Sequence, residues 1–245
     1  DLIVHHATIY TVNAQFDTVS AFAVIDGNFV AIGSEKEIFE NFSSENVIDA
    51  KGMVVFPGFN DGHSHFVAFG LDEIQAADLV GSKSFKEVIK KVVEHSLKND
   101  SEWIRGRGWD QNDWSDQTFP TKDTIDILFP DKPVVLSRID GHAVLVNSET
   151  LRRASITAKT KIEGGEIVLQ NGEPTGILID NAIDLISRIV PKPTDKEKTR
   201  ALKIAQEKCF AAGLTSVTDA GLDLKTILLI DSLQRQNELN IKIYA

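Results

Sequence analysis

Two histidines placed two residues apart carry the clearest chemical information in this chain. His63 and His65 come after the apolar run 54–56 and the pair Asp61 and Gly62. In an extended segment the side chains at i and i+2 point to the same side, so both imidazoles can converge on one metal ion. An isolated His-x-His pair is more often two loop residues. Here it follows a predicted buried strand, which favours a metal-dependent hydrolase.

Five segments of the sequence carry a resemblance to a known family. They are Phe56–Phe66, Glu102–Gln111, Asp131–Ala143, Gly172–Leu178 and Gly213–Gly221. In this order they resemble the amidohydrolase superfamily, in the branch that includes N-substituted formamide deformylases. The resemblance implies that His63 and His65 are metal ligands at the end of the first strand of a (β/α)8 barrel. In such barrels that end of the strands forms the active-site face.

The same resemblance implies roles for three further residues. Asp180 stands where relatives commonly have a glutamate, so we expect it to be a catalytic residue or metal ligand. The alternative is that Asp180 caps the helix predicted over 181–190. His142 follows a strand end and is expected to contact the substrate or the oxyanion, with a structural role as the alternative. Asp219 is similar to family residues at a strand end, but it could equally cap Gly221.

A cluster of aromatic and acidic residues is the candidate substrate-binding surface. Trp109, Asp110 and Trp114 follow the strand predicted from residue 103, and they could form a substrate wall. Tryptophan is as often a core residue, so that alternative stays open. Asp140 is the last candidate in this group, and it either orients His142 or closes the turn before it.

These residues predict the hydrolysis of a carbon–nitrogen bond other than a peptide bond. A divalent ion, zinc by preference, lowers the pKa of its bound water and polarises the carbonyl group of the substrate. We therefore expect a small-molecule amide substrate. Catalytic zinc usually has three protein ligands, and the resemblance places the remaining ligands beyond residue 245. The alternative is a catalytically inactive relative or fragment that acts as a binding protein.

The order of predicted elements indicates an α/β fold with two parts. Residues 1–52 contain short apolar strands and a hairpin turn at 26–28, and the resemblance identifies them as half of a β-sandwich. Residues 53–245 alternate strands and helices, which predicts the N-terminal part of a TIM-type barrel with an insertion around 70–175. After the first strand we expect four further barrel strands. One begins near residue 103, and the other three span 133–139, 214–217 and 241–245.

Two helices of the barrel part have clear boundaries. The apolar spacing predicts a helix over 84–97 with Ser84 or Ser82 as its cap. Thr194 and Glu197 have the spacing of a capping box for a helix that Gly213 ends. A closed barrel has eight strands, so we expect the missing C-terminal barrel half to be needed as a partner, and homo-oligomers are possible.

Composition excludes several functional classes. The net charge is −10, and no cluster of lysine and arginine suits a nucleic acid. No run of about 18 apolar residues predicts a membrane span. The single cysteine, Cys209, lies in a predicted helix, where a buried structural thiol is expected rather than a nucleophile. Because nothing requires an oxidising compartment, we expect a cytoplasmic protein.

Overall fold

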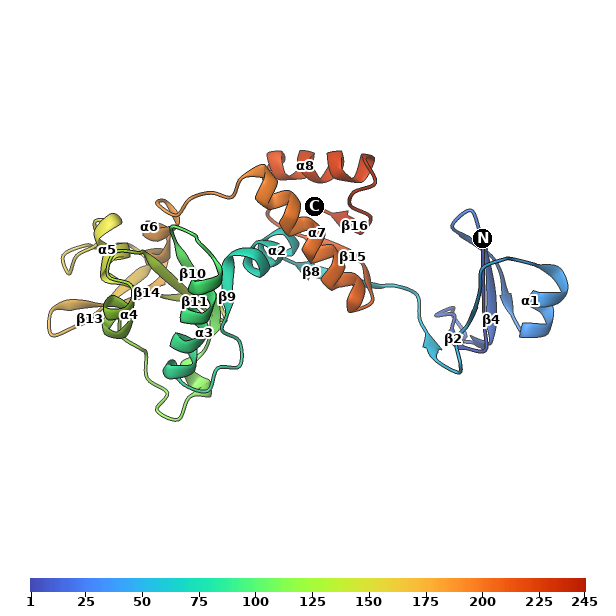
Figure 1. Cartoon of the computed structure of the whole chain (residues 1–245), viewed down its shortest axis with the longest axis horizontal. Helices are drawn as coiled ribbons and strands as arrows, with labels where there is room; N and C mark the ends of the chain where they lie inside the picture. Colours follow the sequence, from blue (N-terminus) through green and yellow to red (C-terminus); the bar gives the residue numbers. More distant parts are fainter. The chain divides into compact units, whose positions relative to one another are not determined.

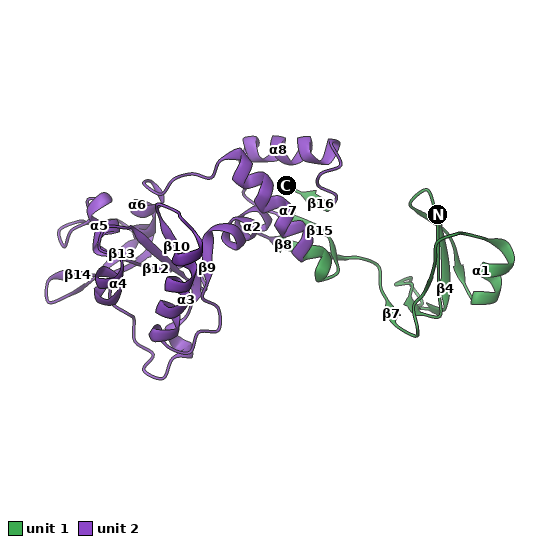
Figure 2. Cartoon of the chain, viewed as in Figure 1, with its two compact units in different colours: residues 1–63, 209–218, 241–244 green, residues 64–208, 219–240, 245 purple.

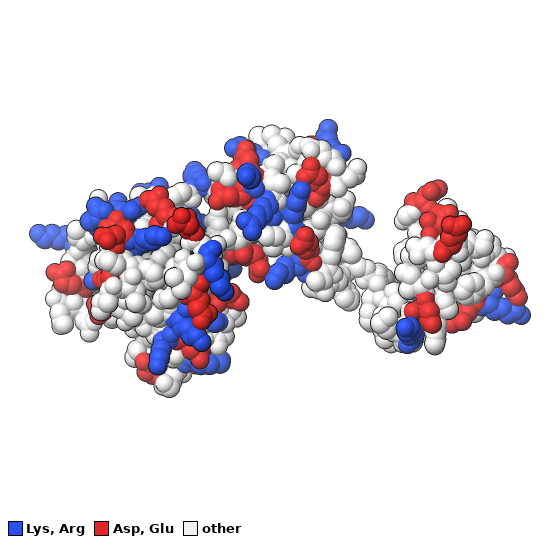
Figure 3. All heavy atoms as spheres, viewed as in Figure 1, with Lys and Arg blue, Asp and Glu red and all other residues white.

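The computed structural model describes residues 1–245, which form two compact units. The first unit contains residues 1–63, 209–218 and 241–244, and the second contains residues 64–208, 219–240 and 245 (Figure 2). No helix of the chain combines the length and the apolar character needed to cross a membrane. On the face drawn in Figure 3, acidic and basic side chains alternate without forming one large basic patch.

The N-terminal residues of the first unit form two small sheets. One has the order β5-β4-β1-β6 and the other the order β3-β2-β7. The turn at Asp26 and Gly27, which have φ values of 50° and 73°, joins β4 to β5 as the sequence predicted. The elements are β1 (Leu2–His5), β2 (Thr8–Tyr10), β3 (Thr18–Val19), β4 (Ala21–Ile25), β5 (Asn28–Gly33), α1 (Glu35–Asn41), β6 (Val47–Asp49) and β7 (Val54–Val55).

A third sheet contains the histidine strand and has the order β16-β15-β8. Its strands are β8 (Phe59–Ser64), β15 (Leu214–Asp219) and β16 (Lys242–Tyr244), and β15 pairs with β16 in parallel. The amide of Phe59 donates to the Gly213 carbonyl at 2.8 Å. Gly213 has a φ of 81°, so it ends the preceding helix in the left-handed region, as predicted.

The second unit is built on a six-stranded sheet with the order β13-β14-β12-β11-β10-β9. Strands β9, β10 and β11 are parallel, whereas β12, β14 and β13 are antiparallel to their neighbours. Asn171 and Gly172, both with positive φ, form the predicted turn between β13 and β14. The strands are β9 (Ala76–Asp78), β10 (Ile104–Trp109), β11 (Val134–Arg138), β12 (Ala143–Val146), β13 (Gly165–Gln170) and β14 (Glu173–Asp180).

Helices cover both faces of this sheet, and Figure 1 shows α3 alongside β9 and β10. Val88 and Val92 of α3 are buried against Leu136 and Ile104, while Ile186 packs with Val144 on another core. The helices are α2 (Phe66–Gln75), α3 (Phe85–Lys98), α4 (Asp123–Leu128), α5 (Ser148–Arg153), α6 (Asp184–Ser187), α7 (Asp195–Ala211) and α8 (Leu224–Arg235), with 3-10 turns at Gln111–Asp113 and Asn181–Ile183.

The sheet order corrects two expectations from the sequence. Strands β10 and β11 were expected to follow the histidine strand in one barrel sheet, but they belong to the six-stranded sheet, and β15 is the neighbour of β8. The reason is that local apolar patterns predict a strand but not its partner. The second expectation was that the run 54–56 is the buried strand that leads into the histidines. Instead, Val54 and Val55 form the separate strand β7, Val54 is 54% exposed, and the histidines follow from β8.

Candidate functional site

The two histidines lie where β8 turns into α2. His63 is the residue before the last in β8, and His65 is the N-cap residue of α2, with φ −120° and ψ 63°. Both residues are exposed. The carboxylate of Asp61 accepts a hydrogen bond from the His63 amide at 3.0 Å, which orders the end of the strand. The His65 side chain makes no capping hydrogen bond, so the first turn of α2 needs another acceptor.

Asp219 supplies that acceptor from the end of β15. Its side chain is 2% exposed, and its Oδ2 accepts a hydrogen bond from the Val67 amide at 3.1 Å. Val67 is two residues after His65, so this contact holds the backbone that follows the histidine pair. The sequence offered two roles for Asp219: a residue similar to those of the family at this strand end, or a cap for Gly221. In the structure the Asp219 carboxylate caps α2. The sequence signal for a role near the histidines was the position of Asp219 at a strand end.

His142 and Asp180 form an imidazole–carboxylate pair at the edge of the six-stranded sheet. The antiparallel register of β12 and β14 places Ala143 opposite Ile179, and the Asp180 amide donates to the His142 carbonyl at 3.0 Å. His142 Nδ1 lies 2.8 Å from Asp180 Oδ1. Both residues are exposed. Asp180 makes no side-chain capping bond, so its carboxylate serves His142 and not the following helix.

Asp180 has an unusual backbone conformation for a residue with a side chain. Its φ is 48° and its ψ is −124°, a region that strongly favours glycine. Such strain costs about 1–3 kcal/mol and tends to occur at functional sites. The functional role of Asp180 stays a prediction.

An arginine that the sequence did not indicate joins the acidic candidates. Arg138 ends β11, and its guanidinium donates to Asp140 Oδ2 at 2.9 Å and to Asp110 Oδ1 at 3.3 Å. The other oxygen of Asp140 accepts the His142 amide at 3.0 Å. Asp140 therefore orients the turn that carries His142, which is one of the two roles predicted for it. The Nε of Arg138 is buried and has no hydrogen-bond partner.

The tryptophans of the expected substrate wall are core residues. Trp109 is 1% exposed and donates from Nε1 to the Leu136 carbonyl at 2.7 Å. Trp114 is 5% exposed and donates to the Ser82 carbonyl at 3.1 Å. These contacts support the core alternative that the sequence left open. Their contact with a substrate remains a prediction.

A metal ion finds part of a ligand set in this chain. Imidazole nitrogens are suitable zinc ligands, and His63 and His65 offer two of them. No group of three or more histidine, cysteine, aspartate or glutamate side chains in residues 1–245 is placed to hold an ion. The two imidazoles are therefore the right type of ligand for a catalytic zinc ion, but they are fewer than the three protein ligands such an ion usually has. Cys209 adds none, because burial raises the pKa of its thiol and disfavours the thiolate.

Two solved structures share the fold of the chain. A metal-dependent hydrolase from Pyrococcus horikoshii OT3 matches with a TM-score of 0.71 and 24% identity, over 100% of this chain and 48% of that one. A metal-dependent hydrolase from Pyrococcus furiosus matches with a TM-score of 0.70 and 25% identity, over 100% of this chain and 49% of that one. Neither hydrolase has been characterised.

Curated relatives match over most of the chain. The protein YtcJ of Bacillus subtilis (strain 168) is 36% identical over 217 residues, which are 86% of this chain and 41% of that protein. An N-substituted formamide deformylase of Arthrobacter pascens is 29% identical over 237 residues, 92% of this chain and 43% of that enzyme. LONG AFTER FAR-RED 3 of Arabidopsis thaliana is 31% identical over 227 residues, 90% of this chain and 38% of that protein.

The chain thus spans less than half the length of these three relatives. The model of the amidohydrolase family matches residues 46–243, a range that contains the histidine pair, the whole six-stranded sheet and β15. A match of this extent shows that the chain belongs to the amidohydrolase family.

Proposed function

We propose that this chain is part of a metal-dependent hydrolase that acts on carbon–nitrogen bonds other than peptide bonds, with zinc as its metal. The observation that carries the proposal is the His63-x-His65 pair at the end of β8, followed by an amide that the buried Asp219 holds. The formamide deformylase of Arthrobacter pascens supports the substrate class by its name. A small-molecule amide is the substrate that this proposal implies.

His63 and His65 would be the metal ligands that this chain contributes. A bound zinc ion supplies an activated water and polarises a carbonyl group. The chain's own residues position the ligands: Asp61 orders the end of β8, and Asp219 orders the first turn of α2. A preorganised ligand pair loses little conformational freedom when it binds an ion.

His142 and Asp180 would manage a proton in this reaction. A carboxylate accepts but does not donate, so the bond to Asp180 would favour the His142 tautomer that carries its proton on Nδ1. The Nε2 atom then carries the free electron pair and can take a proton from a substrate or a water molecule. Asp180 acts through His142 in this scheme, so it is a positioning residue.

The sheet β16-β15-β8 would be the beginning of a (β/α)8 barrel, and the six-stranded sheet would be its insertion. The N-terminal sheets would be half of a β-sandwich, as the family resemblance implies. Three strands leave a barrel open. The remaining strands, with the further metal ligands, would come from a C-terminal barrel half, which is the partner that this proposal requires.

Removal of the ligand pair tests the proposal. In the full-length protein, His63→Ala with His65→Ala should abolish both the bound zinc and the amide hydrolysis, measured by elemental analysis and by turnover of a panel of formamides and acyl amides. His95→Ala is the matched control, because His95 lies in α3 and its ring contacts the Asn99 amide. An unchanged metal stoichiometry in the double variant would show that the ligand assignment is wrong.

The alternative is a binding protein without turnover. The described residues bring no three metal-ligand side chains together, and this is equally expected of a relative that lost the chemistry and of a chain whose further ligands come from the C-terminal barrel half. Metal content decides between the two proposals. About one or two equivalents of zinc in the full-length protein would support the hydrolase, and a folded protein free of metal would support the binding protein.

A further inference from the structure

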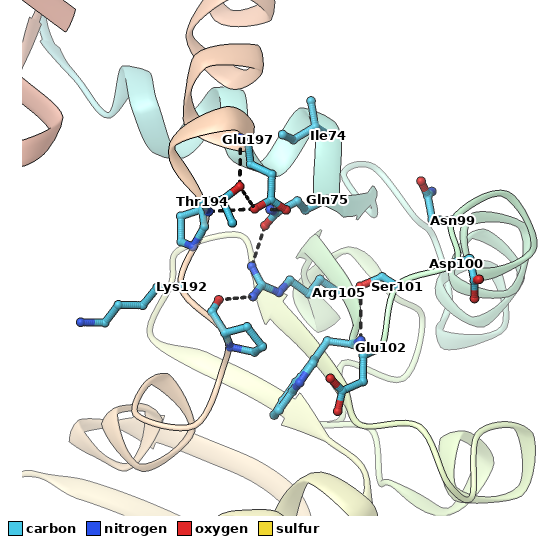
Figure 4. A pocket seen from close by; sticks show the side chains of 13 residues that line it. Ile74, Gln75, Asn99, Asp100, Ser101, Glu102, Arg105, Lys192, Thr194 and Glu197 are labelled. Atoms are coloured by element: carbon cyan, nitrogen blue, oxygen red, sulfur yellow. Dashed lines mark hydrogen bonds between the residues drawn. The ribbon is translucent and has the colours of Figure 1, made fainter. Parts of the chain in front are cut away.

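A cavity of about 530 Å³ opens at the amino-terminal end of β10, the opposite end of that strand from Asp110. Figure 4 shows it between the C-terminal end of α2, the loop before β10 and the segment before α7. All of its lining residues belong to the second unit. Its size lies in the range of small-molecule sites, and none of the candidate residues for amide hydrolysis lines it.

Arg105 is the central charged group of this cavity. Its Nη1 donates to Gln75 Oε1 at 2.8 Å and its Nη2 donates to the Pro191 carbonyl at 3.1 Å, both visible in Figure 4. A guanidinium has five N–H donors, so these two bonds leave donors for another acceptor. Arg105 forms no ion pair at contact distance. Burial lowers its pKa, whereas the more distant charges of Asp72 and Glu197 raise it, and the group stays charged. A partly desolvated cation with no carboxylate in direct contact can still bind an anion through its free donors.

Three acidic side chains line the cavity, and each has a partner. Asp100 lies 4.0 Å from the Lys132 ammonium. Glu102 accepts a hydrogen bond from Arg153 Nη1 at 2.6 Å. Glu197 accepts hydrogen bonds from the Thr194 amide and hydroxyl at 2.8 and 2.6 Å, and from Gln75 Nε2 at 3.1 Å. Gln75 thus lies between Glu197 and Arg105 and bonds to both (Figure 4). Glu197 and Asp72 act on the charge of Arg105 only from beyond ion-pair distance, so the guanidinium has no carboxylate in direct contact.

Part of the lining, which also contains polar side chains, offers apolar surface. Ile74, Pro191 and Pro193 contribute it, and Lys192 adds a second cation that forms no ion pair. We propose that this cavity binds a small organic carboxylate, whose charged end lies on the Arg105 guanidinium and whose apolar body lies against the two proline rings. A guanidinium fork matches the geometry of a carboxylate, and the apolar surface selects an organic anion over an inorganic one.

Titration with simple probes tests the ligand class. Benzoate, benzamide, acetate and inorganic phosphate are added to the ¹⁵N-labelled protein, and the Arg105 Nε–Hε resonance is followed by NMR. Benzoate should shift this resonance in a saturable way and bind at least about tenfold more tightly than benzamide, which has the same ring without the charge. Acetate should bind more weakly than benzoate because it lacks the apolar body.

A charge series at the exposed Lys192 tests the location without disturbing the bonds of Arg105. Lys192→Gln and Lys192→Glu should weaken benzoate binding stepwise, by about twofold for each unit of charge, because the Lys192 side chain extends away from Arg105 (Figure 4). Lys86→Glu is the matched control, because it makes the same change in net charge on an exposed lysine that does not line the cavity. Arg105→Gln should abolish the benzoate titration, and Arg105→Lys should retain only a part of it.

Three results would each overturn the proposal. The first is an absence of saturable benzoate binding up to the millimolar range. The second is phosphate or benzamide binding as tight as that of benzoate, which would remove the organic part or the charge from the argument. The third is an equal effect of Lys192→Glu and Lys86→Glu. If Arg105→Gln fails to fold, the Lys192 series still decides the outcome.

Discussion

At the scale of single residues, two aspartates do different work for the candidate site. Asp219 is buried and satisfies a backbone amide beside the histidine pair. Asp180 is exposed, bonds to an imidazole and keeps a backbone conformation that costs free energy. Asp219 should therefore contribute to stability, whereas Asp180 should contribute to function and lower stability.

Asp219→Ala should lower the free energy of unfolding by about 1–3 kcal/mol, because it leaves the Val67 amide without its acceptor. Asp219→Asn keeps an acceptor oxygen and should retain most of the stability. Urea unfolding of both variants measures the difference. Asp116→Ala is the control, since Asp116 is exposed and its loss should change stability by less than about 0.5 kcal/mol. Equal effects of Asp219→Ala and Asp116→Ala would contradict the capping role.

Asp180→Gly should raise the free energy of unfolding by about 1 kcal/mol, because glycine adopts a φ of 48° without strain. Asp180→Asn keeps the strain and should leave stability nearly unchanged. Both variants should lower turnover in the full-length protein if Asp180 positions His142. Thermal unfolding and amide turnover measure the two effects. A stabilised Asp180→Gly variant with full activity would remove Asp180 from the proposed mechanism.

At the scale of elements, local features of the sequence predicted more than the pairing of strands. The capping box of Thr194 and Glu197 and the turn at Asn171 and Gly172 are confirmed, because each depends on residues that are neighbours in the chain. The sheet of β10 was not predictable in this way. An apolar strand fits several sheets, and contacts distant in sequence decide among them.

The candidate site shows the same difference between features local in sequence and contacts between distant residues. The His63 and His65 pair was apparent from its spacing, whereas the bond from Asp180 to His142 joins residues that are 38 positions apart. Arg138 is a further example, because its partner Asp110 follows another strand, 28 positions earlier in the chain. Sequence spacing therefore revealed single functional residues, and the structure was needed to show which of them act together.

Thr194→Ala should destabilise the chain by about 1 kcal/mol at pH 7, the usual effect of losing an N-cap. Hydrogen bonds from Thr194 hold the pKa of Glu197 below its ordinary value of 4.5. A lowered folded-state pKa contributes stability above pH 4.5 that is lost as the pH falls through the folded value. The difference between wild type and variant should therefore shrink toward pH 3.

Urea unfolding at pH 7 and pH 3 measures this change. Ser187→Ala is the control, because the Ser187 hydroxyl donates to the Ile183 carbonyl and has no carboxylate partner. Its effect should not depend on pH in this range. A Thr194→Ala effect that stays constant between the two pH values would contradict the link to Glu197.

At the scale of the whole molecule, the chain carries several large apolar side chains that are exposed to solvent. Phe29 is 70% exposed, Met53 is 63% exposed and Phe16 is 56% exposed, all within the first unit. The three-stranded sheet has two outer strands, β8 and β16. Exposed apolar side chains and free strand edges promote association.

Residues 1–245 expressed alone should therefore self-associate and should not turn over amides. Size-exclusion chromatography with light scattering should give a mass that rises with concentration, and elemental analysis should find less than one equivalent of tightly bound zinc. Co-expression with a C-terminal barrel half should restore a single species. A monodisperse monomer with tight zinc and amide turnover would contradict both the open-barrel proposal and the assignment of missing ligands.

The pairing of β8 with β15 also determines when the histidine strand can fold. Asn60 accepts a hydrogen bond from Ser216, a residue 156 positions later in the chain. At a synthesis rate of about 5–20 residues per second, β8 waits roughly 8–30 s on the ribosome for its neighbour. The intervening six-stranded sheet has its own core and can form during that time. The metal-ligand segment would then be among the last parts to fold, exposed to chaperones while the sheet is already complete.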